Sequence, residues 1–149
     1  AKPRLLKSVY LAEGALAARN RLLMEKYAAM QAEACAECWN TDDAELVVVA
    51  FGSMARIARS AIRKLREEGL KAGLFRPKTL YPFPADALRA LAPGRRFLVI
   101  EQNTGQMVED VRLSLMGENA RVDWHGVMPG LFIGADALED PIRQACKEN

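Results

Sequence analysis

The apolar and polar positions divide the chain into two regions with different periodicities. From Leu11 to about Trp39, apolar residues recur at helical spacing among good helix formers, which predicts one long helix. From Leu46 onwards, short apolar runs alternate with amphipathic stretches, which is typical of βαβ units around a mainly parallel sheet. We therefore expect a connecting segment over residues 1–41 and an α/β domain over residues 42–149.

The second region contains four predicted strands, each followed by a predicted helix. The first strand is a nearly continuous run of β-branched residues, which is typical of a strand covered on both faces. Ser53 is a plausible cap for the helix that follows it. Arg76–Pro84 contains three prolines and is predicted to be a loop. The strands are Leu46–Phe51, Lys71–Phe75, Arg96–Ile100 and Arg121–Trp124, and the helices are Met54–Glu68, Ala85–Leu91, Gly105–Leu115 and Ala135–Lys147.

The most informative stretch is Glu101–Arg112, EQNTGQMVEDVR, which follows the third predicted strand. It begins as a polar loop at the carboxyl end of that strand and continues as the start of a helix. In open α/β sheets, ligands and partners meet such loops. An ordinary strand-to-helix turn has the same pattern, so periodicity alone does not assign a function.

Three blocks of sequence in order carry a family resemblance. They are VVVAFGSMARIARSAIRKLREEG (Val47–Gly69), GLFRPKTLYPFP (Gly73–Pro84) and EQNTGQMVEDVR. From about Asp42 to about Val127, the chain resembles the carboxyl-terminal domain of the alpha subunit of 2-oxoacid:ferredoxin oxidoreductases, above all those acting on branched-chain 2-oxoacids or 2-oxoglutarate. The resemblance implies a three-layer α/β/α sandwich like the carboxyl-terminal domain of transketolase. Its mainly parallel five-stranded sheet would have one antiparallel edge strand.

The resemblance also implies a function for a larger complex. That complex would cleave a 2-oxoacid on thiamine diphosphate, reduce ferredoxin through iron–sulfur clusters and release an acyl-coenzyme A. The implied partners are the other domain of the alpha subunit, a thiamine-binding beta subunit and a ferredoxin-like subunit. Six positions that match the family motif are expected to make domain or subunit contacts near the active site: Glu101, Asn103, Gly105, Gln106, Glu109 and Arg112.

The sequence does not contain the signatures of a self-contained active site. The turn at Gly52-Ser53 has one glycine, whereas a dinucleotide fingerprint needs three. No serine lies in a nucleophile elbow. The Gly-Asp-Gly…Asn signature of thiamine diphosphate enzymes is also absent. We therefore expect this chain to hold no catalytic, cofactor-binding or metal-binding residue. Thiamine diphosphate, magnesium and the clusters would be bound elsewhere in the complex.

Cysteine and histidine are too few for a conventional metal centre. Cys35 and Cys38 form a C-x-x-C pair inside the long helical pattern, and only Cys146 and His125 could join them. Structural zinc takes about four ligands, so structural roles are favoured, with a redox pair or a shared metal as the alternative. His125 is expected to anchor a loop or the core. The odd number of cysteines and the lack of a signal peptide favour a cytoplasmic location.

The charge balance excludes some classes of partner. The chain has 21 Lys and Arg and 19 Asp and Glu, and a net charge of +2 does not favour nucleic acid or an anionic membrane. No apolar run reaches the ~18 residues of a membrane span. A basic cluster on the first amphipathic helix is interpreted as a solvated face, with phosphate binding as the alternative. The cluster consists of Arg56, Arg59, Arg63, Lys64 and Arg66.

Two other functions remain compatible with the sequence. One is a free-standing small-molecule or nucleotide-binding module that uses the Gly52 and Gly105 loops. The other is a fragment of a transketolase-like enzyme or 2-oxoacid dehydrogenase that passes electrons elsewhere. Under any of these functions, the long helix over Leu11–Trp39 is a candidate contact for a homo-oligomer.

Overall fold

The computed structural model describes residues 8–147 and divides the chain into two compact units, Ala1–Glu33 and Ala34–Asn149. In the first unit, helix α1 (Ala15–Met30) is followed by a short 3₁₀ turn, η1 (Gln31–Glu33). No residue of α1 is buried, and its apolar side chains are spread around the helix. The predicted helix is confirmed, but it does not gather its apolar residues into a stripe.

The prediction that the helix continues to Trp39 is wrong. Residues Ala36–Trp39 form strand β1, which pairs antiparallel with β3 (Ala72–Pro77). Alanine and glutamate suit a helix locally, but pairing satisfies the backbone groups of this segment and packs Trp39 against the core. The sheet therefore begins before residue 42, and residues 1–41 are not wholly a helical connection.

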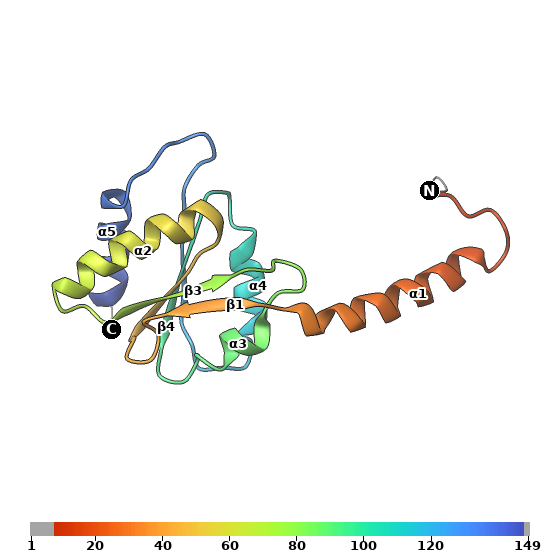
Figure 1. The fold of residues 1–149 in the computed structure, drawn as a ribbon, viewed down its shortest axis with the longest axis horizontal. Helices are drawn as coiled ribbons and strands as arrows, with labels where there is room; N and C mark the ends of the chain where they lie inside the picture. Colours follow the sequence, from red (N-terminus) through yellow and green to blue (C-terminus); the bar gives the residue numbers. More distant parts are fainter. Residues whose placement is uncertain (1–7, 148–149) are drawn as a thin grey trace, which may run out of the picture. The chain divides into compact units, whose positions relative to one another are not determined.

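The second unit is built on a five-stranded sheet in the order β1-β3-β2-β4-β5 (Figure 1). The remaining strands are β2 (Leu46–Val49), β4 (Arg96–Glu101) and β5 (Val122–Gly126). β2, β3, β4 and β5 run parallel, and β1 is the antiparallel edge strand. The mainly parallel sheet with one antiparallel edge strand is confirmed. β3 extends to Pro77 and therefore includes the first two residues of the predicted loop.

Helices cover both faces of this sheet and make three layers (Figure 1). The helices are α2 (Gly52–Glu67), α3 (Ala85–Arg89), α4 (Met107–Ser114) and α5 (Asp136–Lys147). α2 and α5 pack on one face, where Leu46 and Val48 point. α3 and α4 pack on the other, where Val47 and Val49 point. Because side chains alternate along a strand, a strand covered on both faces needs a continuous apolar run, as β2 has.

The predicted cap at Ser53 is wrong. Helix α2 already begins at Gly52, and its N-cap position is Phe51, which makes no side-chain cap. Gly52 has a φ of 57°, in the left-handed region that favours glycine. This glycine turns the chain directly from β2 into α2, so Ser53 already lies inside the first helical turn.

Candidate functional site

Exposed apolar residues lie at the carboxyl ends of two of the parallel strands, after β3 and in and after β5. Because β2 to β5 run parallel, the loops that follow them lie at one edge of the sheet. We call these exposed residues and the loop over 102–106 the carboxyl-edge surface. Phe132 is fully exposed and Trp124 is 40% exposed. The exposed apolar members are Leu80, Tyr81, Trp124, Met128, Leu131 and Phe132.

Glu101 is completely buried at the end of β4, and its carboxylate organises the start of α4. Oε2 accepts a hydrogen bond of 2.7 Å from the Met107 backbone N–H. Oε1 accepts bonds of 3.1 Å from the Val108 N–H and 3.0 Å from the Trp124 indole N–H. A carboxylate is well placed at the positive end of a helix, so Glu101 holds β4, α4 and β5 together.

Asn103 and Gly105 shape the loop between β4 and α4. The Asn103 Oδ1 accepts hydrogen bonds from the backbone N–H groups of Gly105, at 2.8 Å, and Gln106, at 3.1 Å. This is an Asx turn. Gly105 has a φ of 100°, which a residue with a side chain rarely adopts. The Asn103 side chain therefore fixes the turn of the loop, and the Glu101 side chain fixes the start of α4 that follows it.

Trp124 completes this arrangement, although it lies outside the family motif. Its ring packs against Gly105 and Gly126, and a Cβ atom at Gly126 would collide with the ring. The tryptophan thus lies between two glycines and donates its indole N–H to Glu101. Gly126, two residues after Trp124, was the only signal in the sequence, and it is too weak to predict this packing.

The other three predicted contact residues lie at the N-cap and on the surface of α4. Gln106, Glu109 and Arg112 are exposed at intervals of three residues, which places them along one side of the helix. Beside them, burial and the charges of Glu109 and Glu101 raise the pKa of Asp110. Glu101, Asn103 and Gly105 thus shape the loop, whereas the side chains of the other three predicted residues are exposed to solvent. Their contact with a partner stays a prediction.

The long loop between β5 and α5 is attached to this site by two hydrogen bonds, of which the first runs from the Val127 backbone N–H to the Glu101 backbone carbonyl, at 2.9 Å. The Gln102 Nε2 donates a bond of 2.7 Å to the backbone carbonyl of Leu131. A hollow of about 320 Å³ lies beneath the loop. It is lined by Ser53 and Ile57 of α2, Gln102 and residues 130–133. The hollow is mainly apolar and contains no charged side chain, which does not suit an anionic nucleotide phosphate.

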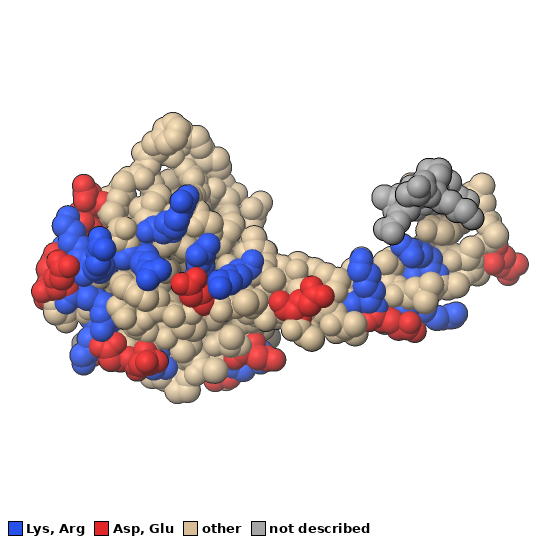
Figure 2. All heavy atoms as spheres, viewed as in Figure 1, with Lys and Arg blue, Asp and Glu red and all other residues tan. Residues whose placement is uncertain are grey.

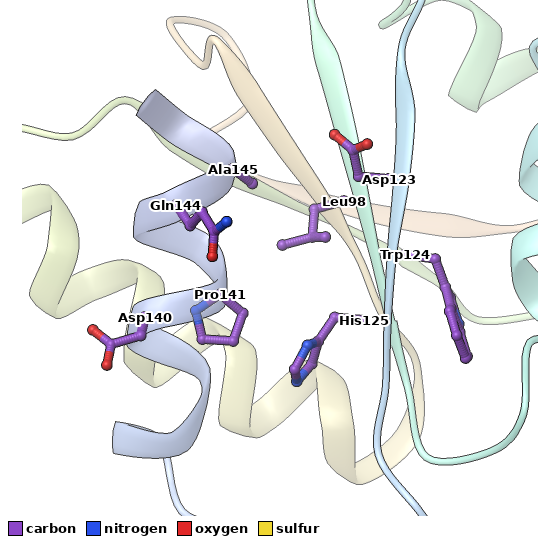
Figure 3. Close-up of a pocket in the computed structure, with 8 residues that line it drawn as sticks. All are labelled: Leu98, Asp123, Trp124, His125, Asp140, Pro141, Gln144 and Ala145. Atoms are coloured by element: carbon purple, nitrogen blue, oxygen red, sulfur yellow. The ribbon is translucent and has the colours of Figure 1, made fainter. Parts of the chain in front are cut away.

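A second hollow, of about 470 Å³, lies between β5 and α5 (Figure 3). The His125 side chain points into it, whereas the Trp124 ring points to the other side of β5 (Figure 3). Burial lowers the pKa of His125 and so favours the neutral imidazole. Asp123 and Asp140 are paired with Arg121 and Arg143. Both carboxylates that line the hollow are therefore engaged by arginines.

The cysteines and acidic residues do not form a metal centre within residues 8–147. Cys35 precedes β1, Cys38 lies on β1 and Cys146 lies on α5, and all three are free thiols. Burial raises the pKa of the Cys146 thiol. In this described part of the chain, no group of three or more His, Cys, Asp and Glu side chains has a geometry that could hold a metal ion. No helix over the same residues is long and apolar enough to cross a membrane.

The fold and site define a three-layer α/β domain with a fixed loop between β4 and α4 at its carboxyl edge. The family model for the pyruvate:ferredoxin oxidoreductase core domain II matches residues 44–132. The chain belongs to this family. The match agrees closely with the range over which the sequence resembles the alpha subunits, and it confirms that interpretation.

Two relatives support this family membership. A ketoisovalerate oxidoreductase subunit from Methanothermobacter thermautotrophicus is 46% identical over 112 residues, which are 74% of this chain and 32% of the relative. A 2-oxoglutarate synthase subunit from Methanocaldococcus jannaschii is 45% identical over 69 residues, 46% of this chain and 19% of the relative. The chain thus spans about a third of the first relative's length.

Two solved structures have the same fold. The 2-oxoglutarate:ferredoxin oxidoreductase from Magnetococcus marinus superposes with a TM-score of 0.75 at 19% identity, covering 93% of this chain and 24% of that one. A split-gene transketolase superposes with a TM-score of 0.60 at 20% identity, covering 70% of this chain and 39% of that one. The expected likeness to the transketolase fold is confirmed.

Proposed function

We propose that this chain is a non-catalytic assembly domain of the alpha subunit of a 2-oxoacid:ferredoxin oxidoreductase. The complex converts a 2-oxoacid and coenzyme A into an acyl-coenzyme A and reduces ferredoxin. The domain presents its carboxyl-edge surface to the other domain of the alpha subunit and to the thiamine-binding beta subunit. A ferredoxin-like subunit completes the complex.

The carboxyl-edge surface is the observation that carries this proposal. Six large apolar side chains are exposed there, at the ends of β3 and β5, and exposed apolar surface supports an interaction site. The neighbouring loop over 102–106 is held in place by Asn103 and Glu101, so this part of the surface gains little order on binding. Gln106, Glu109 and Arg112 supply the polar residues that surround the apolar centre of a typical interface.

Residues 8–147 do not offer a fitting site for the cofactors of such a complex. Thiamine diphosphate requires a magnesium ion held by oxygen ligands. The best-placed carboxylate, Glu101, already accepts three hydrogen bonds from the chain's own donors. We therefore assign thiamine diphosphate, magnesium and the iron–sulfur clusters to other domains and subunits, and derive no reaction step through this chain.

A domain replacement tests the proposal. The corresponding region of the Methanothermobacter thermautotrophicus ketoisovalerate oxidoreductase subunit is replaced by this chain and expressed with the partner subunits. We expect an assembled complex that oxidises ketoisovalerate. The double variant Leu131→Asp/Phe132→Asp should lower assembly by about tenfold or more, because central apolar residues dominate interface energies.

A matched control uses exposed apolar residues away from the carboxyl edge. Leu113 lies in the last turn of α4 and Met116 lies just after the helix, and they are 65% and 74% exposed. Leu113→Asp/Met116→Asp should leave assembly and activity nearly unchanged. Equal loss in both double variants, or a folded chain that binds a nucleotide and no subunit, would contradict the proposal.

A further inference from the structure

The outward ridge of α2 carries positive charge that the chain compensates only in part. Arg56, Arg59 and Arg63 are all exposed, and their spacing places them along one face of the helix. We call these three residues the arginine ridge. α2 has five cationic side chains and a single carboxylate, Glu67, although the whole chain has a net charge of only +2. Figure 2 shows Lys and Arg side chains gathered over this helix.

The other two cations of α2 are neutralised within the chain. The Lys64 Nζ lies 2.6 Å from the Glu139 carboxylate on α5. The Arg66 guanidinium lies 2.6 Å from the carboxylate of Asp43. By contrast, the side chains of Arg56 and Arg63 form no ion pair or hydrogen bond within residues 8–147. Lys64 and Arg66 on the flanks of α2 are therefore paired within the described part of the chain, whereas Arg56 and Arg63 on the ridge are not.

The middle arginine of the ridge is fixed in position by β1. The Arg59 Cζ lies 4.9 Å from the centroid of the Trp39 ring, and one of its nitrogens lies 3.8 Å from Glu37. Glu37 is itself shared with Arg76, at 3.4 Å. Stacking on an aromatic ring orients a planar guanidinium and lowers the entropy lost when it binds an anion. One oriented cation therefore lies between two unpaired ones.

We propose that the arginine ridge docks an acidic segment of another protein, whose carboxylates are spaced to match the three guanidinium groups. This inference is independent of the proposed function, because the ridge and the carboxyl-edge surface consist of different residues. Charge complementarity selects the partner: unpaired arginines on a rigid helix steer and orient carboxylates. Bidentate contacts between guanidinium and carboxylate add specificity.

The shape of the ridge argues for a protein segment over other anions. Small ligands bind in concave sites, whereas the ridge is the outer face of a helix. The hollows at α5 and at the carboxyl edge are lined by other residues. The ridge is about 10 Å long, from the rise per residue of an α-helix. That length suits two turns of an acidic helix and is short for a nucleic acid track.

Labelled poly-L-glutamate tests this proposal. Binding is measured by fluorescence anisotropy at low ionic strength, with an oligothymidylate of equal charge as the competing probe. Arg56→Gln/Arg63→Gln should weaken poly-L-glutamate binding by about three- to tenfold, given the usual strength of exposed ion pairs. Arg59→Lys keeps the charge but removes the planar stack, and it should also weaken binding.

The control removes the same number of positive charges from another helix. Arg19→Gln/Lys26→Gln removes two exposed cations from α1 and should leave binding within about twofold of the parent chain. Circular dichroism checks that each variant is folded. Equal loss in the two double variants, unchanged binding in Arg59→Lys, tighter binding of the oligothymidylate, or no saturable binding by the parent chain would each overturn the proposal.

Discussion

At the scale of single residues, one buried carboxylate fixes the candidate site. Glu101 has no exposed surface, yet no polar side-chain atom is left without a partner among the buried residues described. A buried charge is tolerated only when it is fully paired or hydrogen-bonded. Two backbone donors of α4 and the indole of Trp124 satisfy it. The position of the loop over 102–106 therefore depends on this side chain.

Glu101→Gln should destabilise the second unit by about 1–3 kcal/mol, because one acceptor becomes a donor that faces an N–H group. Urea unfolding followed by tryptophan fluorescence measures the change and also reports on the surroundings of Trp124. Glu109→Gln, on the exposed side of α4, should stay within about 0.5 kcal/mol of the parent chain. Similar values for the two variants would contradict the role given to Glu101.

The lowered pKa of His125 leads to a second prediction at the scale of single residues. Burial lowers its pKa from 6.5, so the unfolded chain binds the proton more readily than the folded one. The resulting stability is present above about pH 6.5 and is lost as the pH falls through the folded pKa. The free energy of unfolding of the parent chain should decrease more steeply between about pH 7 and pH 5 than that of His125→Asn. Parallel curves would contradict this.

At the scale of elements, β1 shows how a tertiary contact overrides local propensity. The sequence of Ala36–Trp39 predicts a helix, but the segment forms the edge strand of the sheet and pairs with β3. Gly73 on β3 is a further sign of close packing, since a Cβ there would lie 2.5 Å from the Asn40 carbonyl oxygen. By contrast, α1 buries none of its side chains. A homo-oligomer contact through the segment Leu11–Trp39 stays a prediction.

Two truncated chains test the separate contributions of α1 and β1 to stability. A chain that begins at Ala34 should unfold with nearly the free energy of the full chain, because α1 contributes no buried residue. A chain that begins at Asp42 loses β1 and the packing of Trp39, and it should be less stable by about 2 kcal/mol or more. Thermal and urea unfolding measure both values. Equal stability of the two truncations would contradict the part assigned to β1.

At the scale of the whole chain, the structure separates two surfaces with different chemistry. The carboxyl-edge surface is apolar and lies on the loops after the parallel strands. The arginine ridge is basic and lies along α2. Apolar surfaces suit lasting contacts between domains or subunits, whereas charged ones suit orientation and fast association. The two surfaces therefore predict two separate kinds of interaction.

The sequence by itself determined the alternation of strands and helices from Leu46 onwards and the family of the domain. These properties are local, because each depends on a continuous run of apolar residues or on a block such as EQNTGQMVEDVR. The strand pattern was reliable where burial covers both faces, as in β2.

Only the tertiary structure decided which residues meet. It joined β1 to β3, brought Trp124 onto Glu101 and Gly105, and left Arg56 and Arg63 unpaired while Lys64 found Glu139. These pairings connect residues far apart in the chain, and their energies depend on distance and burial in space. No pattern along the sequence contains that information, because side-chain spacing along one element does not determine which side chains of another element it faces.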